Sequence, residues 1–205
     1  MNSIKLSVIC ILVLLSTACS MQQVKSNSTA FYVSDFTPSG DLVVTAASPE
    51  KSTSLEFMNY KQKFEEKLSS AGYNIVNSIE QADYIAEIDY KITPGETLIS
   101  SSPVYATGSY RFGRSFSLGA NRAVSSSTDA ITLYDKLITL EIMKATTETT
   151  SENSKVYESR IKSLGSCADL AGVFDPLLTT LFNNFPGENG KTMTTTVTYQ
   201  GECDD

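Results

Sequence analysis

Residues 82–92, ADYIAEIDYKI, alternate between apolar and polar side chains with a period of two. The apolar set is Tyr84, Ala86, Ile88, Tyr90 and Ile92, and the polar set is Asp83, Glu87, Asp89 and Lys91. Alternation with one polar face predicts a strand that is buried on one side only. A chain with such a strand must supply other elements to cover the apolar side, so the fold has to contain a layer packed on this sheet.

Two helical stripes can supply that layer. Apolar residues recur every three or four positions over 54–71, with Lys and Glu between them, which predicts a helix that begins after Ser54 or Ser52 and ends at Gly72. A second stripe covers 170–185 and stops at Pro186-Gly187. Pro176 lies inside this stripe, so either the helix is kinked there or Asp175 caps a second helix; the continuous phase favours the kink.

The remaining segments predict an α+β fold. Strands are expected at 31–36, 73–76, 130–148, 155–163 and 193–200, with a polar turn at 149–154 and 155–163 as the antiparallel partner of 130–148. The run 37–53 is expected to be mostly loop, and Pro94-Gly95 is expected to end the strand at 82–92. We therefore expect a single domain over 31–205 with a mostly antiparallel sheet and two amphipathic helices packed on one face.

The first 19 residues, MNSIKLSVICILVLLSTAC, have the pattern of a signal peptide. Lys5 precedes an apolar run, Leu6 to Leu15, which is too short to span a bilayer as a helix. The sequence Ser16-Thr17-Ala18-Cys19 resembles the lipobox of bacterial lipoproteins, although Ser16 stands where that pattern prefers Leu. The alternative is an ordinary secretory signal cleaved near Ala18, which would leave Cys19 free.

The resemblance to a lipobox implies that residues 1–18 are removed and that Cys19 carries fatty acyl chains such as palmitate. Ser20 follows the cysteine, and in the sorting rule of enteric bacteria this implies an outer-membrane lipoprotein whose body faces the periplasm or the cell surface. Residues 19–30 are polar and aperiodic, and are expected to form a tether between the membrane and the domain. The membrane is thus the first expected partner, reached through the lipid at Cys19.

The other cysteines predict a disulfide. Cys10 lies in the signal peptide, and Cys167 and Cys203 remain as a pair in an oxidising compartment. A redox pair or a metal site is the alternative, but there is no Cys-x-x-Cys spacing and no His to support it.

The composition excludes several classes of function. Without any His, the chain has no Ser-His-Asp triad, Cys-His dyad or His-x-x-x-His zinc motif. With 16 Lys and Arg against 23 Asp and Glu, nucleic acid is not an expected partner. The run 187–192, GENGKT, lacks a phosphate-binding spacing because Phe185 stands where glycine is required. We expect no catalytic, cofactor-binding or metal-binding residues.

The segment 105–122 is the candidate partner surface. It is predicted to be a flexible hairpin that combines aromatic and basic residues in an otherwise acidic protein, and such residues are enriched at binding hot spots. The residues singled out are Tyr105, Tyr110, Arg111, Phe112, Arg114 and Phe116.

Four segments, LSSAGYNIV, EQADYIAEIDYKI, KVYESRIKS and FNNFPGENG, occur in this order behind the lipobox. This series resembles the bacterial envelope lipoproteins grouped as domain of unknown function 4136 (DUF 4136), over about residues 31–200; the stretch 97–128 fits it least. The resemblance implies a small α+β fold and an envelope location, and it supplies no catalytic residues. The expected function is a non-enzymatic lipoprotein that binds an envelope protein or glycan. The alternative is a periplasmic hydrolase acting on envelope polymer or lipid.

Overall fold

The computed structural model describes residues 22–112, 116–145 and 155–199, with backbone pairing alone for 100–129. The helices are α2 (Pro49–Ser52), α3 (Leu55–Ala71), the 3₁₀ helix η1 (Ile79–Gln81) and α4 (Ala171–Phe182). The strands are β1 (Gln22–Tyr32), β2 (Asp41–Ala46), β3 (Asn74–Ile75), β4 (Tyr84–Phe112), β5 (Phe116–Lys144), β6 (Lys155–Gly165) and β7 (Thr192–Tyr199).

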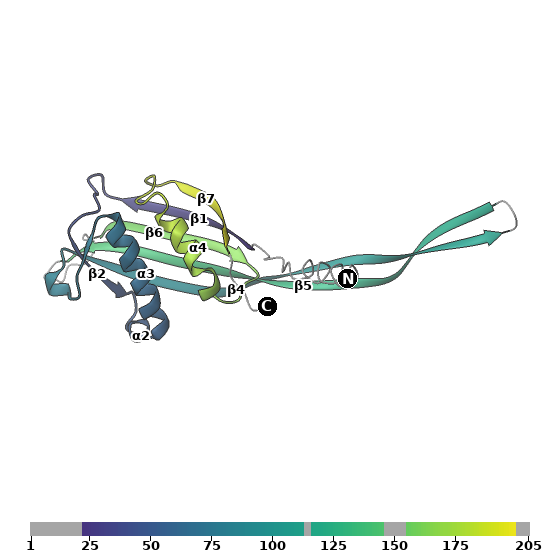
Figure 1. Cartoon of the computed structure of the whole chain (residues 1–205), viewed down its shortest axis with the longest axis horizontal. Helices are drawn as coiled ribbons and strands as arrows, with labels where there is room; N and C mark the ends of the chain where they lie inside the picture. The colour runs from purple at the N-terminus through teal and green to yellow at the C-terminus, as the bar shows by residue number, and fades with distance from the viewer. Residues whose placement is uncertain (1–21, 113–115, 146–154, 200–205) are drawn as a thin grey trace, which may run out of the picture.

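The strands form one mixed sheet in the order β3-β2-β4-β5-β6-β1-β7 (Figure 1). The pairs β4–β5, β5–β6, β6–β1 and β1–β7 are antiparallel. β2, in contrast, runs parallel to both β3 and β4. Parallel neighbours need a crossover connection, and α2 and α3 provide it between β2 and β3. The α+β class is confirmed, and the antiparallel sheet expected from the sequence has a parallel edge.

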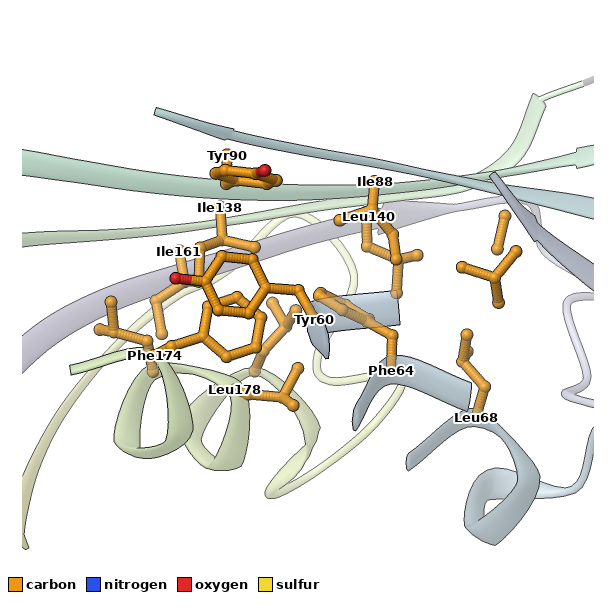
Figure 2. Close-up of a cluster of buried hydrophobic side chains, with 14 of the residues drawn as sticks. Tyr60, Phe64, Leu68, Ile88, Tyr90, Ile138, Leu140, Ile161, Phe174 and Leu178 are labelled. Atoms are coloured by element: carbon orange, nitrogen blue, oxygen red, sulfur yellow. The ribbon is translucent and has the colours of Figure 1, made fainter. Parts of the chain in front are cut away.

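Helices α3 and α4 cover the same face of the sheet, and the core lies between them and the strands (Figures 1 and 2). Tyr60 and Phe64 of α3 meet Phe174 of α4, and the Tyr60 and Phe174 rings stack with their centroids 3.7 Å apart. The apolar set of the alternating strand is turned toward this layer, and Ala86 and Ile88 are inaccessible to solvent. The helix and the one-sided strand predicted from the sequence are both confirmed.

Local chemistry explains where α3 begins and ends. The Ser54 side chain accepts a hydrogen bond from the backbone N–H of Phe57 at 3.0 Å, which caps the first turn. Gly72 ends the helix at a φ of 120°, where a Cβ would lie 2.7 Å from the Pro38 carbonyl oxygen. Only glycine fits this position without moving the backbone.

Helix α4 passes through Pro176 as one element. The continuous stripe is therefore confirmed, and the alternative of a second helix that starts after Asp175 is wrong. Thr180 donates a hydrogen bond to the Pro176 carbonyl oxygen at 3.0 Å, which keeps that group satisfied inside the apolar layer.

The expected tether is wrong from residue 22 onward, because β1 starts at Gln22 rather than at Phe31. β1 is a central strand between β6 and β7, and it buries Val24 and Ser26. Its neighbour β7 is rich in Thr, and Thr29 and Thr192 share a hydrogen bond of 2.8 Å between their hydroxyl oxygens. The first eight residues of β1, QQVKSNST, are mostly polar and show no alternating apolar pattern, which is why the sequence indicated a tether.

Two further expectations are corrected. The run 37–53 contains β2, whose residues Leu42, Val43 and Val44 are buried, together with α2. Pro94-Gly95 does not end β4, because the pairing with β5 continues at Thr97 after a register shift. A Cβ on Gly95 would lie 2.8 Å from the Leu133 carbonyl oxygen, so the glycine allows the close backbone approach at this irregularity.

Candidate functional site

The most prominent feature of the molecule is a two-stranded arm that projects from one end of the sheet (Figure 1). We define the arm as residues 97–112 of β4 paired with 116–132 of β5. Within the sheet, β4 also pairs with β2 as far as Ile88, and β5 also pairs with β6 as far as Tyr134. In the arm, β4 and β5 pair only with each other among the described residues.

Within the part of the chain that the structure describes, the two outer backbone edges of the arm are therefore unpaired. Unpaired N–H and C=O groups on a strand edge can accept another strand, and an isolated two-stranded ribbon is only marginally stable in water. Natural proteins shorten, charge or cover such edges.

The predicted partner surface lies at the far end of the arm. The register places Tyr110 opposite Leu118, Arg111 opposite Ser117, and Phe112 opposite Phe116. Tyr105 is farther from the tip, opposite Ala123 and beside a second register shift. Arg114 lies outside the described residues. The hairpin predicted at 105–122 is confirmed in its backbone, and its role as a partner surface remains a prediction.

Lys136 marks the base of the arm, and sequence reasoning did not single it out. Its side chain is 2% exposed, and Nζ donates weakly to the carbonyl oxygens of Gly165 at 3.4 Å and Tyr134 at 3.5 Å. Burial lowers the pKa of this ammonium group, and the nearby Asp135 carboxylate partly offsets the effect. The lysine joins the end of β6 to β5 where the arm leaves the sheet.

A second cluster lies across the sheet. Glu87, Glu141 and Glu158 occupy one cross-strand row on β4, β5 and β6. Lys155 bridges two of them, with Nζ 2.8 Å from a Glu141 carboxylate oxygen and 3.3 Å from one of Glu158. Burial and the Glu141 charge raise the pKa of Glu87, while Lys155 acts in the opposite direction. The hydrogen bond to Glu141 raises the pKa of Lys155.

The other carboxylates of the 82–92 strand have separate partners. Asp83 accepts a hydrogen bond from the backbone N–H of Asp41 at 3.0 Å, and Asp89 forms an ion pair with Lys51 of α2. Lys51 also donates to the Tyr90 carbonyl oxygen at 2.6 Å. These groups fasten β4 to neighbouring elements and do not converge on a common point.

Two surface hollows are small. One, of about 90 Å³, lies beside the glutamate row and is lined in part by Thr139 and Arg160. The other, of about 30 Å³, lies near the C-terminal end of α4. Sites for drug-sized ligands have roughly 300–1,000 Å³. Across residues 22–112, 116–145 and 155–199, no group of three or more His, Cys, Asp or Glu side chains is arranged to hold a metal ion.

We predict that Glu87→Gln stabilises the protein at pH 7. Like charges directly opposite each other on a sheet are destabilising, by about 0.2–1 kcal/mol. Because the folded-state pKa of Glu87 is raised, its charge opposes folding above that pKa, and the cost disappears when the carboxyl is protonated. Urea unfolding should therefore give Glu87→Gln a higher free energy of unfolding than the wild type at neutral pH. This difference should vanish below the ordinary glutamate pKa of 4.5. Glu50→Gln, at an exposed position of α2, is the control and should change stability little at either pH.

The cysteine positions are only partly described. Cys167 is 6% exposed and follows the end of β6, with Sγ 3.2 Å from the Asp169 carbonyl oxygen. Cys19 and Cys203 lie outside the described residues, so lipidation and the disulfide remain predictions. The loop expected at 187–192 is confirmed as far as Lys191, and β7 starts at Thr192.

The comparisons with known proteins add little. No family model and no curated protein matches this sequence. One similar solved structure is titled as a PDZ domain protein from Parabacteroides distasonis ATCC 8503, at 13% identity and a TM-score of 0.43. The match covers 88% of this chain and 42% of that one, and a likeness this weak supports no functional argument. None of the described helices is long and apolar enough to cross a membrane.

Proposed function

We propose that this chain is a bacterial envelope lipoprotein that acts by contact rather than by catalysis, with the β4–β5 arm as its contact surface. The observation that carries the proposal is the arm itself, a pair of strands continued about sixteen residues beyond the sheet, on whose outer edges none of the described strands pairs. Unpaired strand edges can accept another chain, and aromatic residues and Arg are enriched at binding hot spots.

The N-terminus supports the envelope location. The sequence Ser-Thr-Ala-Cys before Ser20 resembles a lipobox, and lipid at Cys19 would hold the protein in the outer membrane with its body in the periplasm or at the cell surface. The resemblance to DUF 4136 lipoproteins points to the same compartment. The proposal needs no cofactor and no metal.

Site-specific photo-crosslinking in living cells tests the arm. A photoreactive amino acid at Tyr110 should capture an envelope component in a defined adduct. The matched control is the same amino acid at Leu55, which is 82% exposed at the start of α3 and should give no such adduct. Equal crosslinking from both positions, or none from Tyr110, would contradict the proposal.

We also propose that Cys167 and Cys203 form a disulfide. The pairing supports this, because β6 ends two residues before Cys167 at the arm end of the sheet, and β7 reaches Tyr199 opposite Gln22 at that same end. The two strands are separated only by β1. Four residues after Tyr199 are enough chain to cover the width of two strand spacings, about 10 Å.

This disulfide would close a loop of 36 positions, for which chain entropy gives about 4 kcal/mol of stability. Reduction should lower the unfolding temperature of the protein. A non-reduced tryptic digest examined by mass spectrometry should contain one peptide pair joined through Cys167 and Cys203. Recovery of both thiols in alkylatable form from envelope protein would show that the pair does not form.

A further inference from the structure

The arm and the N-terminus leave the sheet at the same end. Ser26 of β1 pairs with Ser163 of β6, Ser163 with Lys136 of β5, and Lys136 with Ile92 of β4. These four residues define one row across four strands. From this row, β1 runs back to Gln22 in the direction in which β4 runs out to Phe112, because the alternating antiparallel pairing fixes both directions (Figure 1).

From this row, the chain reaches Cys19 over a much shorter distance than it reaches the tip of the arm. Cys19 is three residues before Gln22, so the two are joined by at most about 11 Å of chain. Gln22 itself lies four residues beyond the row, about 13 Å at the usual rise of a strand. The arm extends twenty residues beyond the same row, from Ile92 to Phe112, which is about 65 Å. An anchor at Cys19 would therefore lie beside the base of the arm, far short of its tip.

An anchor so close to the sheet limits how the molecule can stand on a membrane. The body lies on one side of Gln22 and the arm on the other. Turning the arm away from the bilayer would push the body into it. The face of the sheet opposite the helices carries Glu141, Glu158 and Arg160, and charged groups are excluded from lipid. When the arm lies along the lipid surface or points into it, these charged groups stay in water, so the anchor favours these orientations of the arm.

We infer that the arm's partner is the lipid layer itself, and that residues 104–112 and 116–124 rest in its interfacial region. This inference rests on the proposed lipid anchor and names the component that the arm contacts. At the interface, water remains available to the open backbone edges, which the hydrocarbon interior would leave unpaired.

The residue types at the tip agree with this partner. Tyr110 and Phe112 alternate with Ser109 and Arg111 along the chain, and the backbone register pairs Tyr110 with Leu118 and Phe112 with Phe116. Aromatic residues are enriched at the membrane–water interface, and basic residues favour anionic headgroups. The whole chain has a net charge of −7, whereas residues 104–112 and 116–124 contain Arg111 and Arg122 and no Asp or Glu, so this end of the arm is the part that an anionic surface attracts.

A fluorescent reporter of polarity can test the inference on the lipidated full-length mature protein. Ser109→Cys places a label near the tip, opposite Gly119. The control, Ser34→Cys, is exposed and follows Tyr32 at the opposite end of the sheet. Wild-type protein taken through the same labelling without reductant gives the background. Each protein is reconstituted into vesicles of phosphatidylethanolamine and phosphatidylglycerol, and its intact mass is measured to establish the lipid on Cys19.

On reconstitution, the label at residue 109 should shift its emission to the blue and lose intensity when nitroxide-bearing lipids are included. The label at residue 34 should respond to aqueous iodide only. A lipidated protein whose label at 109 stays open to iodide and insensitive to nitroxide lipid would overturn this inference alone. The same holds if the label at 109 responds only after envelope proteins are added. A mature protein without lipid at Cys19 would overturn the proposed function and this inference with it.

Discussion

Cys19→Ala should abolish acylation of the protein, and any variant that is still cleaved should leave the membrane. The lipid at residue 19 is the only proposed anchor, and several acyl chains give stable attachment whereas none leaves only weak surface contact. Metabolic labelling with a radioactive fatty acid should show the label in wild-type protein and none in the variant. Fractionation should then find the variant as uncleaved precursor or as a periplasmic form.

A matched control comes from the same segment. Cys10→Ala changes a cysteine in the expected signal peptide and should leave labelling and membrane location unchanged. Fatty-acid label retained in Cys19→Ala, or lost equally in Cys10→Ala, would refute acylation at Cys19.

The largest loss of stability is expected from Phe174→Ala. Phe174 is inaccessible to solvent, stacks on Tyr60 of α3 and meets the edge of Phe64 with ring centroids 6.1 Å apart (Figure 2). Its ring contacts two aromatic rings of α3, so it forms a large part of the packing between α4 and α3 above the sheet. Truncating a buried phenylalanine costs about 3–5 kcal/mol, because apolar burial is lost and a cavity remains. The unfolding temperature, followed by circular dichroism, should fall by about 2–4 °C for each kcal/mol lost from the free energy of unfolding.

Met58→Ala tests whether such a loss is specific to the interface between the helices. Met58 lies on α3 but is 57% exposed, so its truncation should change the free energy of unfolding by less than about 0.5 kcal/mol. Equal losses in the two variants would contradict the packing described for α3 and α4.

The helices and the one-sided strand could be predicted because their patterns are local. Phe57, Tyr60, Phe64 and Leu68 recur at helical spacing, and all four are buried in α3. Ala86 and Ile88 alternate with charged residues and face the helices. In each case the period of the sequence identifies the buried side without any knowledge of the partner.

β1 could not be predicted, because its environment is set by strands far along the chain. Ser26 is buried against β6, where the Ser163 hydroxyl donates to the Lys25 carbonyl oxygen at 2.9 Å. Nothing in the residues around Ser26 indicates this burial. The glutamate row was missed for the same reason: Glu87, Glu141 and Glu158 become neighbours only through the register of three strands.

The arm was half predicted. Alternation around Tyr110 and Phe116 indicated a hairpin, but Pro94-Gly95 indicated that the preceding strand ends. The sheet tolerates this pair because Pro94 sits at a register shift and Gly95 meets the Leu133 carbonyl without a side chain. The end of a strand and a register shift within a strand can have the same sequence, here Pro94-Gly95. Only the pairing with β5 shows which of the two is present.

The lipoprotein function depends most on the chemistry of residue 19, and the intact mass of protein extracted from bacterial membranes tests that chemistry directly. We predict a mature chain that begins at Cys19 and carries the added mass of a thioether-linked diacylglycerol and an N-linked fatty acid. A chain with an unmodified Cys19, or with its N-terminus at another residue, would contradict the lipoprotein function proposed for this protein.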